Sequence, residues 1–124
     1  MKLRVLYENQ IIPSLADLYR LKPLIAAEAQ RLYDEWEQGE DCGGICDVIA
    51  YAIMGVVVDH FDINIDMGGQ DGDDHAFVVI RDDNEMPVAG IDIPHHIYER
   101  GGGYCWTKIE GVRFVPDDVV IWEY

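Results

Sequence analysis

The 124-residue chain has 49% hydrophobic residues, which suits one domain (residues 1–124) with one sizeable core and argues against wholesale disorder. Its 24 acidic residues outnumber nine basic ones and give a formal net charge of −15. This balance leaves no basic patch for phosphates, so it argues against direct nucleic-acid binding, and it would repel an anionic membrane surface. The charge suits a cationic partner, or it simply keeps the protein soluble.

The cysteines and the longest apolar stretch predict a cytoplasmic protein. Met1 to Arg4 lead into mixed sequence without the long apolar region of a signal peptide. The longest apolar run, Val48 to Val58, is about half of the roughly 20 residues that a membrane span needs. Three cysteines cannot all pair within one chain, so we expect reduced thiols.

The first part of the chain predicts one short strand and then two helices. Leu3 to Tyr7 has the composition of a strand. Ser14, with Asp17 three residues later, is a capping signal for a first helix. Pro23 favours the start of a second helix, whose apolar face runs to Trp36. We expect these helices to cover the core.

The remaining part predicts one buried helix followed by strands. Residues 38–44 break the helical pattern, and Ile45 to His60 is apolar nearly all round, as a buried helix would be. We then expect a strand at Ile63–Asp66, a loop at Gly68–Asp74, a strand at Ala76–Ile80, a turn at Asp82–Asn84, its hairpin partner at Val88–Ile93, a helical turn within Pro94–Arg100, a glycine loop at Gly101–Gly103, a strand at Tyr104–Trp106, a turn at Pro116–Asp118 and a strand at Val119–Trp122.

Helices followed by mostly antiparallel strands indicate the α+β class. We therefore expect N-terminal helices and a central helix that carries Cys46, packed on a mainly antiparallel sheet.

Three residues of this pattern predict a specific chemistry. Cys46 follows two glycines and opens the apolar helix, and a helix N-terminus favours a reactive thiolate. His75 and Asp92 stand on two strands that should pair, so the histidine can take the thiol proton while the carboxylate fixes its tautomer. Cys46, His75 and Asp92 are therefore the candidate nucleophile, base and orienting acid.

Two further residues are candidates for binding substrate around Cys46. Gly44, with Gly43, lets the backbone turn sharply and lets a substrate approach, and the N–H of Cys46 can help to hold an oxyanion. Trp106 is a candidate to line a substrate cleft, the alternative being packing within a strand.

Three short blocks of the chain resemble papain-like and transglutaminase-like cysteine enzymes. They are Gly44–Ala50, Asp74–Val79 and Gly90–Pro94, which carry the cysteine, the histidine and the acid in the order of those enzymes. Asp92 as third member is closer to the transglutaminase-like and arylamine acetyltransferase pattern than to papain, which has asparagine there. The position of Gln38 resembles papain's glutamine, which implies a role for Gln38 in the oxyanion hole.

The resemblance extends over residues 38–94 and implies a minimal papain-like or transglutaminase-like core. It also implies thiol-dependent acyl transfer by a peptidase, isopeptidase, deamidase or transglutaminase-like enzyme. The resemblance implies a peptide or protein substrate, and the negative net charge of this chain favours a cationic one. We expect no cofactor.

Other interpretations of the same residues remain open. Cys46 is also placed to be a small buried core residue, a common fate of a cysteine without a disulfide. A zinc site is the second alternative, but the spacing of its candidate ligands matches no familiar finger or ribbon: Cys42, Cys46, Cys105, His95 and His96. We expect no metal. The run Asp71–Asp74 lacks the register of a calcium loop and predicts a solvated turn.

The sequence leaves two functions of different classes beside the enzyme. One is a non-catalytic acidic binding protein, such as an inhibitor or a nucleic-acid mimic that occupies a basic site on a partner. The other is a degenerate member of the enzyme fold that is kept for interaction.

Overall fold

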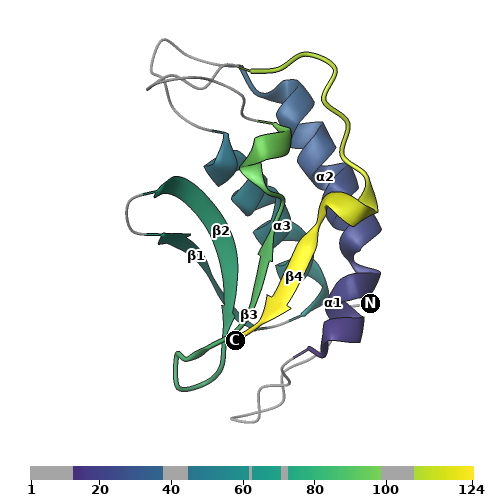
Figure 1. Cartoon of the computed structure of the whole chain (residues 1–124). Helices are drawn as coiled ribbons and strands as arrows, with labels where there is room; N and C mark the ends of the chain where they lie inside the picture. Colours follow the sequence, from purple (N-terminus) through teal and green to yellow (C-terminus); the bar gives the residue numbers. More distant parts are fainter. Residues whose placement is uncertain (1–12, 38–44, 62, 71–72, 99–107) are drawn as a thin grey trace.

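The structure, a computed structural model, describes residues 13–37, 45–61, 63–70, 73–98 and 108–124. In these residues the chain forms three α-helices and a four-stranded antiparallel sheet (Figure 1). The α+β class predicted from the sequence is therefore confirmed.

The N-terminal helices follow the capping and proline signals of the sequence. In α1 (Leu15–Arg20) the Asp17 N–H donates to Ser14 Oγ at 3.1 Å, and the Ser14 N–H donates to Asp17 Oδ2 at 3.0 Å. This reciprocal pair satisfies two amides that a helix start leaves without partners. Pro23 lies in the first turn of α2 (Lys22–Glu35), where its missing N–H costs no hydrogen bond.

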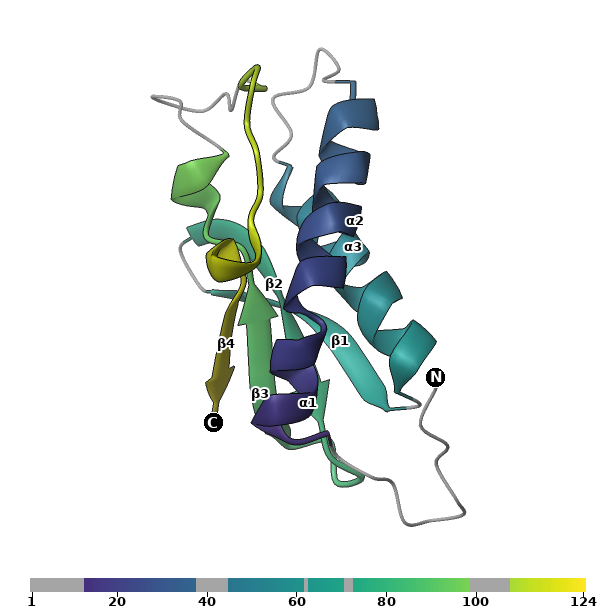
Figure 2. The same ribbon diagram turned by 90° about the vertical axis from the view of Figure 1, so that its right-hand side faces the viewer.

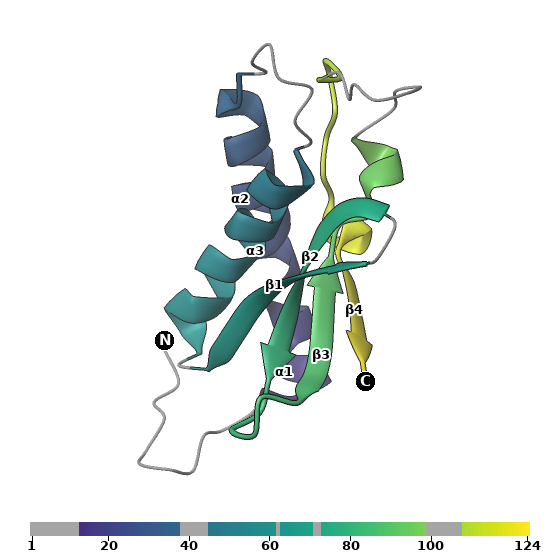
Figure 3. The same ribbon diagram turned by 90° about the vertical axis from the view of Figure 1, so that its left-hand side faces the viewer.

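The helix that carries Cys46 is α3 (Cys46–His60), one residue shorter than predicted because Ile45 is its N-cap. It packs between α2 and the sheet, and the helices all lie on one side of the sheet (Figures 2 and 3). Its length of 15 residues makes it the longest helix in the described ranges, none of which contains a helix long and apolar enough to cross a membrane. The buried residues of α3 are Cys46, Ile49, Ala50, Ala52, Ile53, Val56 and Val57.

The sheet has the strand order β1 (Asn64–Gln70), β2 (Asp73–Arg81), β3 (Pro87–Asp92) and β4 (Val120–Glu123). Each strand pairs antiparallel with the next. The predicted turn between β2 and β3 is present: the side chain of Asp82 accepts the N–H groups two and four residues later. This tight connection fixes the register of the β2–β3 hairpin.

The two faces of the sheet carry different residues. Val78, Ile80 and Ile91 face α3 and are fully buried in the core. Their neighbours Phe77 and Asp92 alternate with them and belong to the opposite face, here named the outer face. The pleat therefore places the predicted acid away from the apolar core.

The prediction of a loop over Gly68–Asp74 is wrong for most of its length. β1 continues to Gln70, and β2 begins at Asp73. Gly68 pairs with Phe77, and a β-carbon on Gly68 would lie only 2.7 Å from Val79 Cγ2. The glycine therefore serves close packing within a strand, where the sequence suggested a loop.

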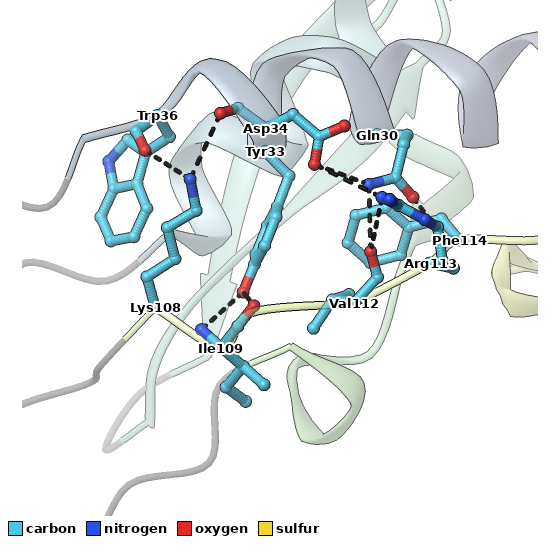
Figure 4. A network of polar contacts seen from close by, with 9 residues as sticks. All are labelled: Gln30, Tyr33, Asp34, Trp36, Lys108, Ile109, Val112, Arg113 and Phe114. Atoms are coloured by element: carbon cyan, nitrogen blue, oxygen red, sulfur yellow. Dashed lines mark hydrogen bonds and ion pairs between the residues drawn. The ribbon is translucent and has the colours of Figure 1, made fainter.

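The segment before β4 is tied to α2 by polar contacts (Figure 4). The Tyr33 hydroxyl accepts from the Ile109 N–H and donates to the Ile109 carbonyl, both at 2.9 Å. Gln30 accepts from the Phe114 N–H at 2.9 Å, and Lys108 Nζ donates to the Trp36 carbonyl at 2.8 Å, at the end of α2. These bonds hold the chain across the helices before it enters the sheet.

The other predicted elements either match with small shifts or lie outside the described residues. The helical turn after Pro94 is η1 (His95–Ile97), and the turn at Pro116–Asp118 is η2 (Pro116–Asp118). The strand at Leu3–Tyr7, the break at 38–44, the glycine loop and the strand at Tyr104–Trp106 are outside the described ranges.

Candidate active site

Cys46 is the first residue of α3 and has 8% of its surface exposed. The first amides of a helix have no acceptor within the helix, and the dipole there favours negative charge. Asp47, the next residue, is exposed, and its Oδ1 accepts from the Val48 N–H at 2.9 Å. Burial alone would fit a core cysteine, so the neighbours of Cys46 decide between the two interpretations.

His75 and Asp92 meet across the β2–β3 pair. Val78 pairs with Ile91, and continuing that register sets Phe77 opposite Asp92 with His75 as its diagonal neighbour on the same face. His75 Nε2 lies 2.7 Å from Asp92 Oδ2, and the two side chains are only 12% and 14% exposed. This is a short, largely buried contact between an imidazole and a carboxylate.

The thiol of Cys46 completes this cluster. α3 packs against β2, the strand that carries His75, and the His75 ring is hydrogen-bonded to Cys46 at the start of the helix. Hydrogen bonds that the His75 ring donates to Asp92, and to a lesser extent to Cys46, raise the pKa of His75 to about 10, against an opposing effect of burial. The ring is therefore protonated at neutral pH and can stabilise a thiolate.

A fourth side chain, His95, joins the cluster and was considered in the sequence only as a metal ligand. Its Nδ1 lies 3.2 Å from His75 Nδ1, and the ring centroids are 4.5 Å apart. His95 opens η1, directly after Pro94 and three residues beyond Asp92. Pro94, two residues after the predicted acid, was the signal in the sequence that the strand ends at this point and a helical turn follows.

The outer face beside Asp92 is apolar and carries rings. Val120 pairs with Asp92, and Trp122 pairs with Gly90 on the next row. The indole of Trp122 lies over Gly90, where a β-carbon would be 2.2 Å from ring atoms, and contacts Phe77 with centroids 5.6 Å apart. The glycine thus lets an aromatic surface form next to the carboxylate.

Three predicted site residues lie outside the described ranges: Gln38, Gly44 and Trp106. The same holds for Cys42 and Cys105 of the zinc alternative. Among the described residues, no group of three or more His, Cys, Asp and Glu side chains has an arrangement that could hold a metal ion.

Comparisons of this chain with models of protein families, with curated proteins and with solved structures find no match.

Proposed function

We propose that the protein is a thiol-dependent acyl-transfer enzyme in which Cys46 attacks, His75 moves protons and Asp92 orients the ring. The observation that carries this proposal is the position of the His75 ring, bonded by Nε2 to Asp92 at 2.7 Å and also hydrogen-bonded to Cys46. A purely structural core cysteine does not need a buried charged pair beside it. The resemblance to papain-like and transglutaminase-like enzymes supports the same roles.

The first half-reaction would start from a thiolate and an imidazolium. The Cys46 thiolate attacks the carbonyl carbon of the substrate, and the carbonyl electrons move onto oxygen. The N-terminus of α3 would stabilise that negative charge. His75 then gives its proton to the leaving amine, the carbon–nitrogen bond breaks, and a thioester on Cys46 remains.

The second half-reaction would decide the class of enzyme. Neutral His75 takes a proton from water or from an amine, which attacks the thioester and restores the thiolate with the imidazolium. Water yields a peptidase, isopeptidase or deamidase, and an amine yields a transferase. A high pKa of His75, about 10, suits the first step, in which the ring must arrive protonated.

The net charge of the chain and the apolar surface beside Asp92 indicate the class of substrate. A net charge of −15 favours a cationic peptide or protein. Val120, Phe77 and Trp122 offer apolar contact area beside Asp92. We also propose a cytoplasmic location, where the thiol would remain reduced.

Selective chemical modification of the Cys46 thiol, by an acylating and an alkylating reagent, tests this proposal. We expect p-nitrophenyl acetate and iodoacetamide to modify Cys46 near neutral pH faster than Cys42 or Cys105, as followed by mass spectrometry of peptides. His75→Ala should slow the reaction of Cys46 and leave the other two thiols unchanged. The Cys46→Ala variant is the control for background acylation. Equal rates for the three thiols in the wild-type protein would count against an enzyme.

The excess of acidic residues favours a second candidate, an acidic binding protein. Arg20 and Arg31 pair within their own helices, and Lys108 bonds to backbone carbonyls, so these three cations are engaged locally. The remaining negative charge could occupy a basic site on a partner. Such a complex should weaken steeply with added salt, and binding unaffected by salt would exclude this candidate.

A further inference from the structure

His75 has a neighbour that the proposed triad does not use. Its Nδ1 faces Nδ1 of His95 at 3.2 Å, which is hydrogen-bond distance. One of the two nitrogens must carry a hydrogen and the other a lone pair, because two N–H groups or two lone pairs would repel.

The surroundings of His75 fix the direction of that bond. A carboxylate only accepts, so Nε2 of His75 carries the hydrogen that reaches Asp92. The ring is protonated at neutral pH, so Nδ1 also carries a hydrogen. His75 therefore donates from Nδ1, and His95 accepts with its own hydrogen on Nε2.

With Nε2 bonded to Asp92, Nδ1 is the nitrogen of His75 left for the hydrogen bond with Cys46. We propose that His95 is a positioning residue of the site, whose Nδ1 lone pair shares the Nδ1 hydrogen of His75 with the sulfur of Cys46. This inference rests on the proposed function. An imidazolium has a single hydrogen on Nδ1, so His95 and the thiolate of Cys46 compete for it. The bond to His95 helps to keep the His75 ring charged, and it weakens the hold of that hydrogen on the thiolate. The sulfur can then attack, and the same hydrogen remains available for the leaving group.

The position of His95 suits this role. It opens η1 directly after Pro94, whose fixed backbone angle limits the paths of the chain after Asp92. The His95 side chain is part-buried at its contact with His75, whereas His96, the next residue, is exposed. The two neighbouring histidines therefore form a natural test pair.

Three variants separate the effect of the hydrogen-bond acceptor of His95 from the effect of its ring packing against His75. In His95→Asn the amide oxygen can stand where Nδ1 accepts, and in His95→Phe a ring of similar shape has no acceptor. His96→Phe makes the same chemical change on the exposed neighbour. His95→Ala replaces His95→Phe if the larger ring prevents folding.

The first readout is the titration of His75, followed by NMR of imidazole nitrogens in labelled protein with a chelator present. We expect the midpoint to fall by about one pH unit in His95→Phe, a tenfold loss of proton affinity. His95→Asn and His96→Phe should stay near the wild-type value. An unchanged midpoint in His95→Phe, or an equal fall in His95→Asn, would overturn the proposal.

The second readout is the alkylation rate of Cys46 against pH. At neutral pH His95→Phe should react up to about tenfold more slowly than wild type, since fewer thiolates are held by a charged His75. At alkaline pH, where thiols ionise unaided, the two rates should converge. A rate difference that persists there would indicate a structural defect and overturn the positioning role.

The two readouts also separate this inference from the proposed function. A reactive Cys46 with an unshifted His75 titration in His95→Phe would overturn the role of His95 and support the enzyme. A shifted His75 titration in His95→Phe, together with an unreactive Cys46 in the wild-type protein, would support the contact of His95 with His75 and overturn the enzyme. Stoichiometric zinc that perturbs both rings and blocks alkylation would overturn the proton-sharing role, because the two nitrogens would then be ligands.

Discussion

His75 and Asp92 lie diagonally across the β2–β3 pair, with 2.7 Å between Nε2 and Oδ2 and little exposure of either side chain. The hydrogen bond that His75 donates to Asp92 is the largest cause of the raised pKa of His75. Replacing the carboxylate by the neutral amide of Asp92→Asn should therefore lower that pKa and reduce the population of the charged pair with Cys46. We expect alkylation of Cys46 at neutral pH to slow about tenfold or more.

The Asp66→Asn variant is the matched control. Asp66 also lies in a strand and is exposed, and its carboxylate accepts from the neighbouring Met67 N–H at 2.8 Å. It should leave both the His75 titration and the alkylation rate unchanged. Equal behaviour of the two variants would show that Asp92 does not orient the ring.

The raised pKa of His75 also predicts how stability depends on pH. The folded protein binds the proton more tightly than the unfolded chain, whose histidine has an ordinary value of 6.5. The contribution of His75 is therefore fully present below about pH 6.5 and is lost as pH rises toward about 10. Its size should be on the order of a few kcal/mol.

Urea unfolding of wild type and His75→Gln across this range isolates the effect from other titrating groups. The difference in free energy of unfolding between the two proteins should shrink steadily from about pH 6 to about pH 10. A difference that stays constant, or grows, would mean that His75 is not held as an imidazolium.

Local signals were enough to predict much of this fold. The reciprocal bonds of Ser14 and Asp17 start α1, and the turn at Asp82 joins β2 to β3, because both signals act between residues near in sequence. The alternation of buried Ile91 with Asp92 along β3 is local in the same sense, since it sets the face that the acid occupies.

Features set by distant packing could not be predicted in the same way. Gly68 belongs to a strand because Phe77 and Val79 cover it, and nothing in its own neighbourhood shows that. The contact of His95 with His75 depends on how the chain leaves Asp92, which spacing does not specify. The papain-like core remains a prediction, since only the α+β class is confirmed.

Packing on the outer face makes Gly90 sensitive to substitution. A β-carbon there would lie 2.2 Å from the indole of Trp122, so Gly90→Ala must displace the ring from Phe77. We expect a loss of about 1–3 kcal/mol in the free energy of unfolding, measured by urea titration. Gly55→Ala is the control of opposite sign. A β-carbon there would meet no atom within 4 Å beyond its chain neighbours and the backbone of its own helix, and alanine favours helix α3 by about 0.5–1 kcal/mol.

The Tyr33 hydroxyl makes both bonds to Ile109 at 2.9 Å, and the residue is 1% exposed. Tyr33→Phe would leave the backbone N–H and carbonyl of Ile109 without that partner, at a cost of about 1–3 kcal/mol in the free energy of unfolding. Tyr51→Phe removes a hydroxyl from a side chain that is 63% exposed, so it should change stability by less than about 0.5 kcal/mol. Since the contact links α2 to the segment before β4, hydrogen exchange in Tyr33→Phe should rise in that segment first. Equal stability of the two variants would mean that this link contributes little to the fold.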